Sequence, residues 1–248
     1  MDRHEISRIA HTNHPVAAPI STARLRALVQ RATHGVRGRV LDVGCGSGEW
    51  LLEILTTAPR LVGTGVDLHP HPDLAAKSSA AGVADRVTWV EADAATWHDG
   101  EFDLVVCVGA SHAFGGLEDT LRAVRDRLRP GGRCLLGDAV WENPPSPAAL
   151  AELGAGPDDF TDLPGFADRA MAHGFELGEA HISSLEEWDD YEWSWSGSLT
   201  EWALDSPREH PDREQALEVA RAHRRGWLGG YRGQLGFVTA VLHDTRSA

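Results

Sequence analysis

Three aspartates lie in or just after successive β-rich runs of the sequence, and the first of these runs leads into a glycine-rich turn. Asp42 belongs to the apolar run that precedes Gly44-Cys45-Gly46-Ser47-Gly48. Asp67 ends the next run, about 20 residues beyond the turn, which is the spacing of an acid that binds a ribose. Asp93 follows the third run. Because the carboxyl ends of parallel strands meet at one edge of a sheet, these groups are predicted to form one site.

The residue types at this site favour one kind of ligand. Glycine lets the backbone approach a ligand closely, and an acid at the tip of the second strand can accept hydrogen bonds from both ribose hydroxyls. A dinucleotide fingerprint would need a glycine at position 49, where the chain has Glu49. Three carboxylates suit a ligand that carries positive charge rather than phosphates. S-adenosylmethionine, with its ammonium and sulfonium groups, is such a ligand.

These residues need an alternating α/β framework to position them, and the sequence predicts one from Arg39 to about Val140. The predicted strands are Arg39–Val43, Leu61–Asp67, Val87–Glu91, Phe102–Val108 and Arg133–Ala139. The predicted helices between them are Glu49–Thr57, Asp73–Ala81 and Leu117–Arg129, the last ended by Pro130-Gly131-Gly132. The fold class is therefore a doubly wound α/β sheet with helices on both faces.

The rest of the chain is predicted to complete this domain and to cover it with helices. A helix at Phe166–Ala172 precedes a strand at Glu176–Ser183, and Leu235–His243 is the last strand. The segment between these strands is too long for a loop. We predict a single domain over residues 1–248, with an α-helical cap built from residues 1–35 and 184–229.

The second cap segment carries its own helix signals. Ser184 and Glu187 form the sequence pattern of a capping box. Trp188, Trp195 and Trp202 are spaced seven residues apart, so we expect them to share one helix face and to pack onto the sheet domain.

As an ordered set, these motifs resemble class I S-adenosylmethionine-dependent methyltransferases. The resemblance covers about Arg39 to Asp138, and it rests on four segments: Val40–Gly48, Gly63–Asp67, Glu91–Asp93 and Arg129–Gly132. It implies the Rossmann-like seven-stranded sheet of that family, with the last strand antiparallel and inserted next to the fifth. A narrower similarity to bacterial small-molecule members of the family involves His14-Pro15 and Gly137–Pro145.

The resemblance also implies which residues contact the cofactor. Gly44–Gly48 would face the methionyl part, Asp67 the ribose hydroxyls, Asp93 and Ala94 the adenine, and Val108–Ala110 the ammonium and the transferred methyl group. The cofactor-binding residues assigned in this way are Asp42, Gly44, Cys45, Gly46, Gly48, Asp67, Leu68, Asp93, Ala94, Val108 and Gly109. The product formed from the cofactor would be S-adenosylhomocysteine.

His112 is the candidate catalytic residue. Methyl transfer is an in-line displacement, so the protein mainly has to align the nucleophile and the methyl group. A base is needed only where the nucleophile must lose a proton, and imidazole can take one near neutral pH. The alternative is that His112 only bonds the backbone or packs under the cap. The segment Gly109–Gly116 lacks the Asn/Asp-Pro-Pro-aromatic motif of methyltransferases that act on nucleobases and amide nitrogens.

Several residues outside the sheet are candidate substrate contacts, each with a structural role as the alternative. They come from the N-terminal segment, the turn after the fifth strand and the insertion: His14, Trp141, Glu142, Tyr191 and Trp193. Tyr191 and Trp193 lie off the predicted tryptophan stripe, which makes them the better pocket candidates of the insertion.

Composition and charge limit the partners that the chain can have. The formal net charge of −14 disfavours nucleic acid and anionic membrane surfaces. The three cysteines form neither a disulfide framework nor a CxxC metal site, and the histidines show no HExxH pair, so no metal is expected. The sequence has no signal peptide or membrane span, which predicts a cytoplasmic protein.

The sequence as a whole predicts an enzyme that methylates a small organic molecule at oxygen, nitrogen or carbon. A non-catalytic S-adenosylmethionine-binding protein and a nicotinamide-dependent oxidoreductase are the alternatives. The sequence makes no prediction of the oligomeric state.

Overall fold

The computed structural model describes residues 1–247, which divide into two compact units. A sheet unit comprises residues 21–140, 161–182 and those from 237 onward. A helical unit comprises residues 1–20, 141–160 and 183–236. Within the described residues, no helix combines the length and the apolar character that crossing a membrane requires.

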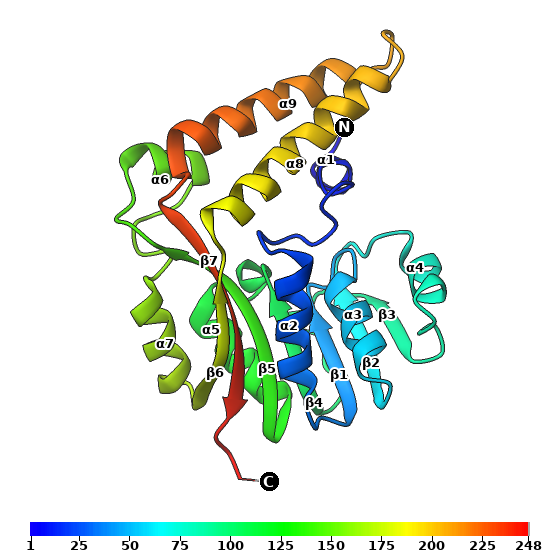
Figure 1. Ribbon diagram of the computed structural model, residues 1–248, viewed down its shortest axis with the longest axis vertical. Coiled ribbons are helices and arrows are strands. Elements are labelled where there is room, and N and C mark those ends of the chain that lie inside the picture. The colour runs from blue at the N-terminus through cyan, green and yellow to red at the C-terminus, as the bar shows by residue number, and fades with distance from the viewer. Residues whose placement is uncertain (248) are drawn as a thin grey trace. The chain divides into compact units, whose positions relative to one another are not determined.

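The sheet unit contains a seven-stranded sheet, in the order β3-β2-β1-β4-β5-β7-β6 (Figure 1). The strands are β1 (Gly38–Val43), β2 (Leu61–Asp67), β3 (Val87–Glu91), β4 (Phe102–Val108), β5 (Leu128–Trp141), β6 (Phe175–Ile182) and β7 (Leu235–Asp244). Neighbouring strands from β3 to β5 are parallel, whereas β7 lies between β5 and β6 and runs antiparallel to β6. The predicted fold class is confirmed, including the position of the last strand.

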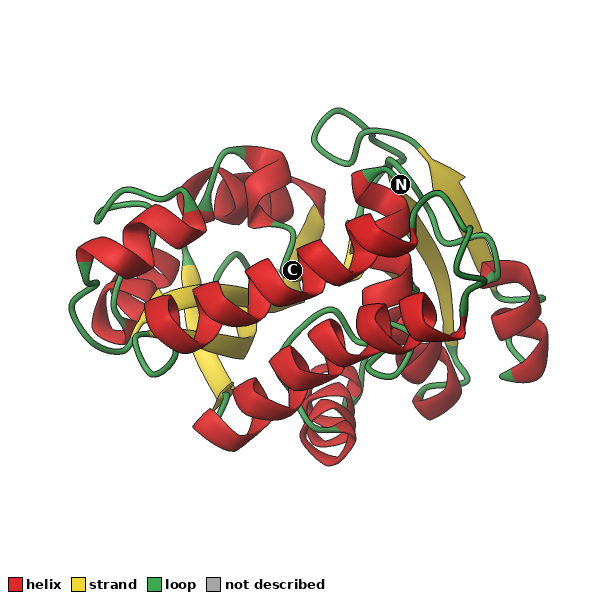
Figure 2. Cartoon of the chain, turned by 90° about the horizontal axis from the view of Figure 1, so that it is seen from above, coloured by secondary structure: helices red, strands yellow, loops and turns green. Residues whose placement is uncertain are grey.

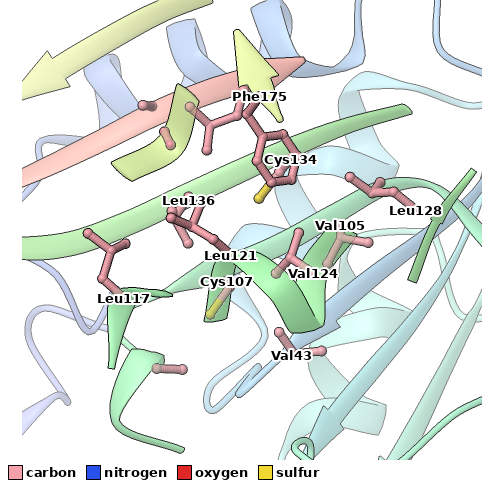
Figure 3. Close-up of a cluster of buried hydrophobic side chains, with 14 of the residues drawn as sticks. Val43, Val105, Cys107, Leu117, Leu121, Val124, Leu128, Cys134, Leu136 and Phe175 are labelled. Carbon is pink, nitrogen blue, oxygen red and sulfur yellow. The ribbon is translucent and has the colours of Figure 1, made fainter. Parts of the chain in front are cut away.

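Helices cover the sheet because its central strands, such as β1 and β4, are apolar and mostly buried. The helices of this unit are α2 (Thr22–Thr33), α3 (Glu49–Thr57), α4 (Leu74–Ala80), α5 (Leu117–Arg127) and α7 (Leu163–Ala172), with a short 3-10 helix η1 at Ser111–Phe114. Helix α5 buries residues spaced four and three apart against alternate residues of β4 and β5 (Figure 3). These side chains are Leu117, Leu121 and Val124 on the helix, and Val105, Cys107, Cys134 and Leu136 on the strands.

The end of α5 differs from the prediction. The helix stops at Arg127, and Leu128 already pairs with Phe102 in the sheet. The register then shifts, because the partner of Leu104 is Arg133. Pro130-Gly131-Gly132 therefore lies in an irregularity of β5 and does not end the helix, since burial of Leu128 in the core fixes the strand earlier.

The helical unit contains α1 (Arg3–Ala10), α6 (Pro147–Leu153), α8 (Leu185–Asp205) and α9 (Arg213–Gly226), followed by a π-helical turn η2 at Trp227–Tyr231. The long helices α8 and α9 lie side by side (Figures 1 and 2). They share a small core with α1, made of Ile9, Ala10, Leu199, Ala203, Ala216, Leu217 and Ala220. The predicted capping box is present: Ser184 accepts from the Glu187 N–H, and Glu187 accepts from the Ser184 N–H.

Two of the three spaced tryptophans have partners within the helical unit, and their packing onto the sheet domain stays a prediction. Trp195 stacks on His223 with ring centroids 3.8 Å apart, and Trp202 meets the ring of His210 edge-on. Both indoles pack against the core of the helical unit. The reason is that α9 supplies alanines and His223 to this face of α8, and His210 lies just before α9.

The limits of the helical unit also differ from those of the predicted cap. Helix α2 contacts α3 and β6, which places residues 21–35 in the sheet unit. Residues 141–160 join the helical unit instead. Whether the chain forms one domain, as the sequence suggests, stays a prediction.

Candidate functional site

The glycine-rich turn after β1 takes a backbone form that favours glycine. Gly44, Gly46 and Gly48 have φ values of 72°, 47° and 77°, in the left-handed region. The N–H groups of Gly44 and Cys45 donate to the Val66 carbonyl, which ties the turn to β2. A Cβ at Gly44 would clash with the Ala110 Cβ, whereas one at Gly46 would meet no atom within 4 Å. The turn is therefore packed on one side and open at Gly46.

Asp67 organises this turn from the end of β2. Its Oδ2 accepts a hydrogen bond from the Gly46 N–H at 2.8 Å, and its Oδ1 accepts one from the His69 N–H at 2.8 Å. A carboxylate oxygen can accept more than one hydrogen bond, so each oxygen keeps a free acceptor position. The side chain is half-buried, and the adjacent Leu68 is exposed.

Asp42 is the buried acid of the site. Its side chain is 3% exposed, and burial together with the nearby charge of Asp67 raises its pKa to about 8. Burial and the same two acids raise the pKa of the Cys45 thiol, so this thiol stays protonated. At neutral pH Asp42 is therefore largely protonated.

Asp93 begins a single helical turn that follows β3. Its Oδ1 accepts from the Ala95 N–H at 2.9 Å, and its backbone carbonyl accepts from the N–H groups of Thr96 and Trp97. Asp93 itself is exposed, whereas Ala94 is buried in the core of the sheet unit.

The segment after β4 carries His112 and a polar pair that the sequence did not predict. Val108 ends the strand, and the Gly109 N–H donates to the Gly137 carbonyl of β5. The Ser111 hydroxyl donates to Asp138 Oδ1 at 2.8 Å. Asp138 is 7% exposed, and burial raises its pKa. Its only signal in the sequence is a single acid within an apolar strand; His112 is exposed nearby.

Lys77 changes the charge around the turn. Its ammonium lies 2.7 Å from Glu49 Oε1 and donates to the Ser47 carbonyl at 3.0 Å. The negative charge of Glu49 is therefore partly compensated, which weakens it as an argument against phosphates. The missing glycine at position 49 still separates this turn from a dinucleotide fingerprint.

The site fits S-adenosylmethionine. The open backbone at Gly46 leaves room for a ligand, and the free acceptor positions of Asp67 suit a ribose diol. The acids Asp42 and Asp67 suit the ammonium and sulfonium groups, since a cation nearby favours the ionised form of Asp42. The predicted cofactor residues thus come from the ends of four consecutive strands of the sheet, in the order β3-β2-β1-β4.

Two of the predicted substrate residues come together in the helical unit. The ring of His14 meets that of Tyr191 edge-on, with centroids 5.3 Å apart. Trp193 lies against Trp227 instead, and Trp141 donates to the Pro157 carbonyl. Glu142 is exposed, and its N–H donates to the Gln234 carbonyl.

His11 is a partner of Tyr191 that sequence reasoning missed. Its Nδ1 lies 2.7 Å from the Ser7 carbonyl oxygen, which can only accept, so Nδ1 carries the hydrogen. Burial lowers the pKa of His11 and favours the neutral ring. Its Nε2 therefore accepts from the Tyr191 hydroxyl at 3.1 Å. Among residues 1–247, no cluster of three or more His, Cys, Asp or Glu could hold a metal ion.

Known proteins resemble the chain both locally and over its length. The model of a family described as "Methyltransferase domain" matches residues 41–134. The uncharacterized protein YjhP of Escherichia coli is 31% identical over 229 residues, which cover 88% of each chain. The 27-O-demethylrifamycin SV methyltransferase of Amycolatopsis mediterranei is 31% identical over 81% of this chain and 75% of its own length.

The fold of the whole chain has a close match among solved structures. A SAM-dependent methyltransferase from Geobacter sulfurreducens, in complex with S-adenosyl-L-homocysteine, matches with a TM-score of 0.85 and 26% identity. The match covers 96% of this chain and 97% of that chain. The glycine-rich turn, the strand-end aspartates and these relatives agree on the cofactor, and the chain is an enzyme that belongs to the class I S-adenosylmethionine-dependent methyltransferases.

Proposed function

We propose that the enzyme methylates a small organic molecule at oxygen, nitrogen or carbon. The observation that carries this proposal is the polar group formed by Ser111, His112 and Asp138 after β4 and within β5. Strand β4 is the sheet neighbour of β1, whose end carries the glycine-rich turn. A polar nucleophile could thus be oriented beside the cofactor without a large docking surface.

Different residues would bind the cofactor and orient the substrate. S-adenosylmethionine supplies a methyl group that the sulfonium has already activated. Gly44–Gly48 and Asp67 would hold the methionyl and ribose parts, while Asp93 and Ala94 would hold the adenine. Asp138 fixes the Ser111 hydroxyl, and exposed His112 could orient the substrate or take its proton.

The charge and the relatives support a small substrate. A net charge of −14 repels phosphate backbones, which disfavours nucleic acid as the substrate. The Amycolatopsis relative is named for methylation of 27-O-demethylrifamycin SV, a small molecule.

A labelling experiment tests the proposal and identifies the substrate. The protein would be incubated with trideuteromethyl-labelled S-adenosylmethionine and a metabolite extract of its host. Mass spectrometry would then search for products that carry the label, with Asp67→Ala as the control for cofactor-independent labelling. A labelled small molecule supports the proposal, and its fragmentation locates the methylated atom. Label found only in nucleic acid or protein would contradict it.

His112→Ala is expected to lower kcat by about a hundredfold, a typical contribution of a positioned acid or base. The Kd for S-adenosylmethionine should stay within about twofold of the wild-type value, because His112 is not assigned to the cofactor. Single-turnover kinetics with the identified substrate and calorimetry with the cofactor would measure the two quantities. His98→Ala, at another exposed histidine of the sheet unit, is the matched control. An unchanged kcat for His112→Ala would exclude the catalytic role.

The assignment of substrate contacts to His14, Trp141, Glu142, Tyr191 and Trp193 remains part of the proposal. Trp193 gives the sharpest test, since 49% of its surface is exposed while Trp227 and the Arg224 cation hold its ring. Trp193→Ala is expected to raise the KM for the substrate by about tenfold, because an aromatic anchor is lost. Leu204→Ala, at a residue of the same helix that is 60% exposed, should leave KM unchanged. Equal KM values for both variants would remove Trp193 from the substrate site.

A further inference from the structure

Arg127 is a buried cation close to the cofactor residues that follow β3. It is the last residue of α5, and it is only 2% exposed. Burial lowers its pKa, which means that placing the charged guanidinium here costs free energy of desolvation. Such a cost needs compensating contacts.

The contacts of the Arg127 guanidinium are concentrated on the turn that begins at Asp93. Its Nη2 donates to the carbonyl oxygens of Ala94 at 3.0 Å, Ala95 at 3.1 Å and Trp97 at 3.1 Å. Its Nη1 donates to the Ala123 carbonyl at 2.8 Å, which folds the side chain back along its own helix. Arg127 Nη2 is therefore hydrogen-bonded to three carbonyl groups of the same turn.

The turn needs such a group because of its own geometry. The N–H groups of residues 95–97 are satisfied by Asp93, through its side chain and its carbonyl. The carbonyls at the other end of a single helical turn have no further helical residues to pair with. A cation is the favourable partner for this negative end. Asp93 and Arg127 thus fix the two ends of the turn.

The same guanidinium also contacts the segment that follows β4. Its carbon lies 5.7 Å from the centre of the Phe114 ring, in the short helix η1 that carries His112. Arg127 therefore contacts both the turn after β3 and the helix after β4.

We propose that Arg127 is a positioning residue for the adenine end of the cofactor site. It holds the turn that presents Asp93 and Ala94, without touching the cofactor itself. The inference rests on the proposed assignment of adenine to these two residues. Arginine suits this role because its planar donors can reach several carbonyls at once, whereas the ammonium of lysine is a more compact donor on a flexible stem.

The experiment compares two ligands that differ only by the adenine base. Calorimetry would measure the Kd values of S-adenosylhomocysteine and of S-ribosylhomocysteine for wild type and Arg127→Met. We expect Arg127→Met to raise the Kd of S-adenosylhomocysteine by about tenfold or more, since several charge-assisted hydrogen bonds that order the turn are lost. The Kd of S-ribosylhomocysteine should not change. Arg122→Met is the matched control, on the same helix but exposed and paired with Asp119.

Amide hydrogen exchange gives a second readout that needs no ligand. Arg127→Met should speed the exchange of residues 95–97, while the amides of the glycine-rich turn keep their wild-type rates. If Arg127→Met does not fold, Arg127→Lys carries the same comparisons, with an intermediate loss of affinity expected.

The outcomes that overturn the inference are distinct. An equal rise in the Kd of both ligands would mean that Arg127 supports the fold in general. No change in either Kd would mean that Arg127 does not position the turn for the adenine. Asp93→Ala separates this failure from a failure of the adenine assignment. If Asp93→Ala selectively weakens S-adenosylhomocysteine and Arg127→Met does not, only the role of Arg127 is lost. If neither variant is selective, the adenine assignment is wrong as well.

Discussion

Replacing Asp67 with alanine is expected to raise the Kd for S-adenosylmethionine by about a hundredfold. A hydrogen bond to a charged group contributes about 1.5–3 kcal/mol, and each 1.4 kcal/mol changes the Kd tenfold, so losing two ribose contacts accounts for this factor. The substitution also removes the acceptor of the Gly46 N–H, which helps to set the glycine-rich turn. The effect should therefore be among the largest for any single side chain of the site.

Asparagine at this position is not a neutral replacement. Asp67 accepts from a backbone N–H at each of its two oxygens. An amide offers only one oxygen, and its NH₂ group would face the other backbone donor. Asp67→Asn should thus weaken binding nearly as much as Asp67→Ala, although its size and shape are almost unchanged.

A modified ligand shows whether the loss comes from the ribose. Wild type should bind the 2′-deoxy analogue of S-adenosylhomocysteine about tenfold more weakly than S-adenosylhomocysteine, whereas Asp67→Ala should bind the two about equally. Calorimetry measures all four values, and Asp85→Ala serves as the control at an exposed acid of the same unit. If the 2′-deoxy analogue binds more weakly than S-adenosylhomocysteine by the same factor in Asp67→Ala and in wild type, Asp67 does not make the ribose contact.

The sheet unit could be predicted well because its signals are local. The ranges Leu61–Asp67 and Glu49–Thr57 were predicted to the residue, since an apolar run and a turn bound each of them in the sequence. The glycine-rich turn has positive φ at Gly44, Gly46 and Gly48, and a cluster of glycines in the sequence indicates such a conformation. The cofactor half of the site is local in the same sense: each acid stands at or near the end of its own strand.

The rest could not be predicted because its contacts join distant segments. His11 meets Tyr191 across 180 residues of sequence, so no spacing rule links them. Asp138 gives no sign that it pairs with Ser111, 27 residues away. Trp195 and Trp202 show the correct helical spacing, but spacing identifies a shared face and not the partner that covers it. Arg127 looks like any cation at a helix C-terminus until the turn at Asp93 is placed against it.

Asp42→Asn is expected to make the protein more stable than wild type at pH 8 and about equally stable at pH 4. The pKa of Asp42 is raised to about 8 in the folded protein, from about 3.9 for an ordinary aspartate. Between these two values the folded state holds a proton that the unfolded state has released. Stability therefore falls as pH rises through this window, by at most about 1.4 kcal/mol per pH unit. Asparagine mimics the protonated acid, and its oxygen can still accept from the Leu51 N–H, so the variant should not show this loss.

Urea unfolding from pH 4 to pH 8 would measure the difference, with Asp85→Asn as the control at an exposed acid. Parallel curves for wild type and Asp42→Asn would mean that Asp42 titrates normally. The cofactor adds a second test of the same charge. A cationic ligand near Asp42 favours its ionised form, so S-adenosylmethionine should stabilise wild type more at pH 8 than at pH 5. The stabilisation of Asp42→Asn should stay constant over that range, because the group that releases the proton is gone.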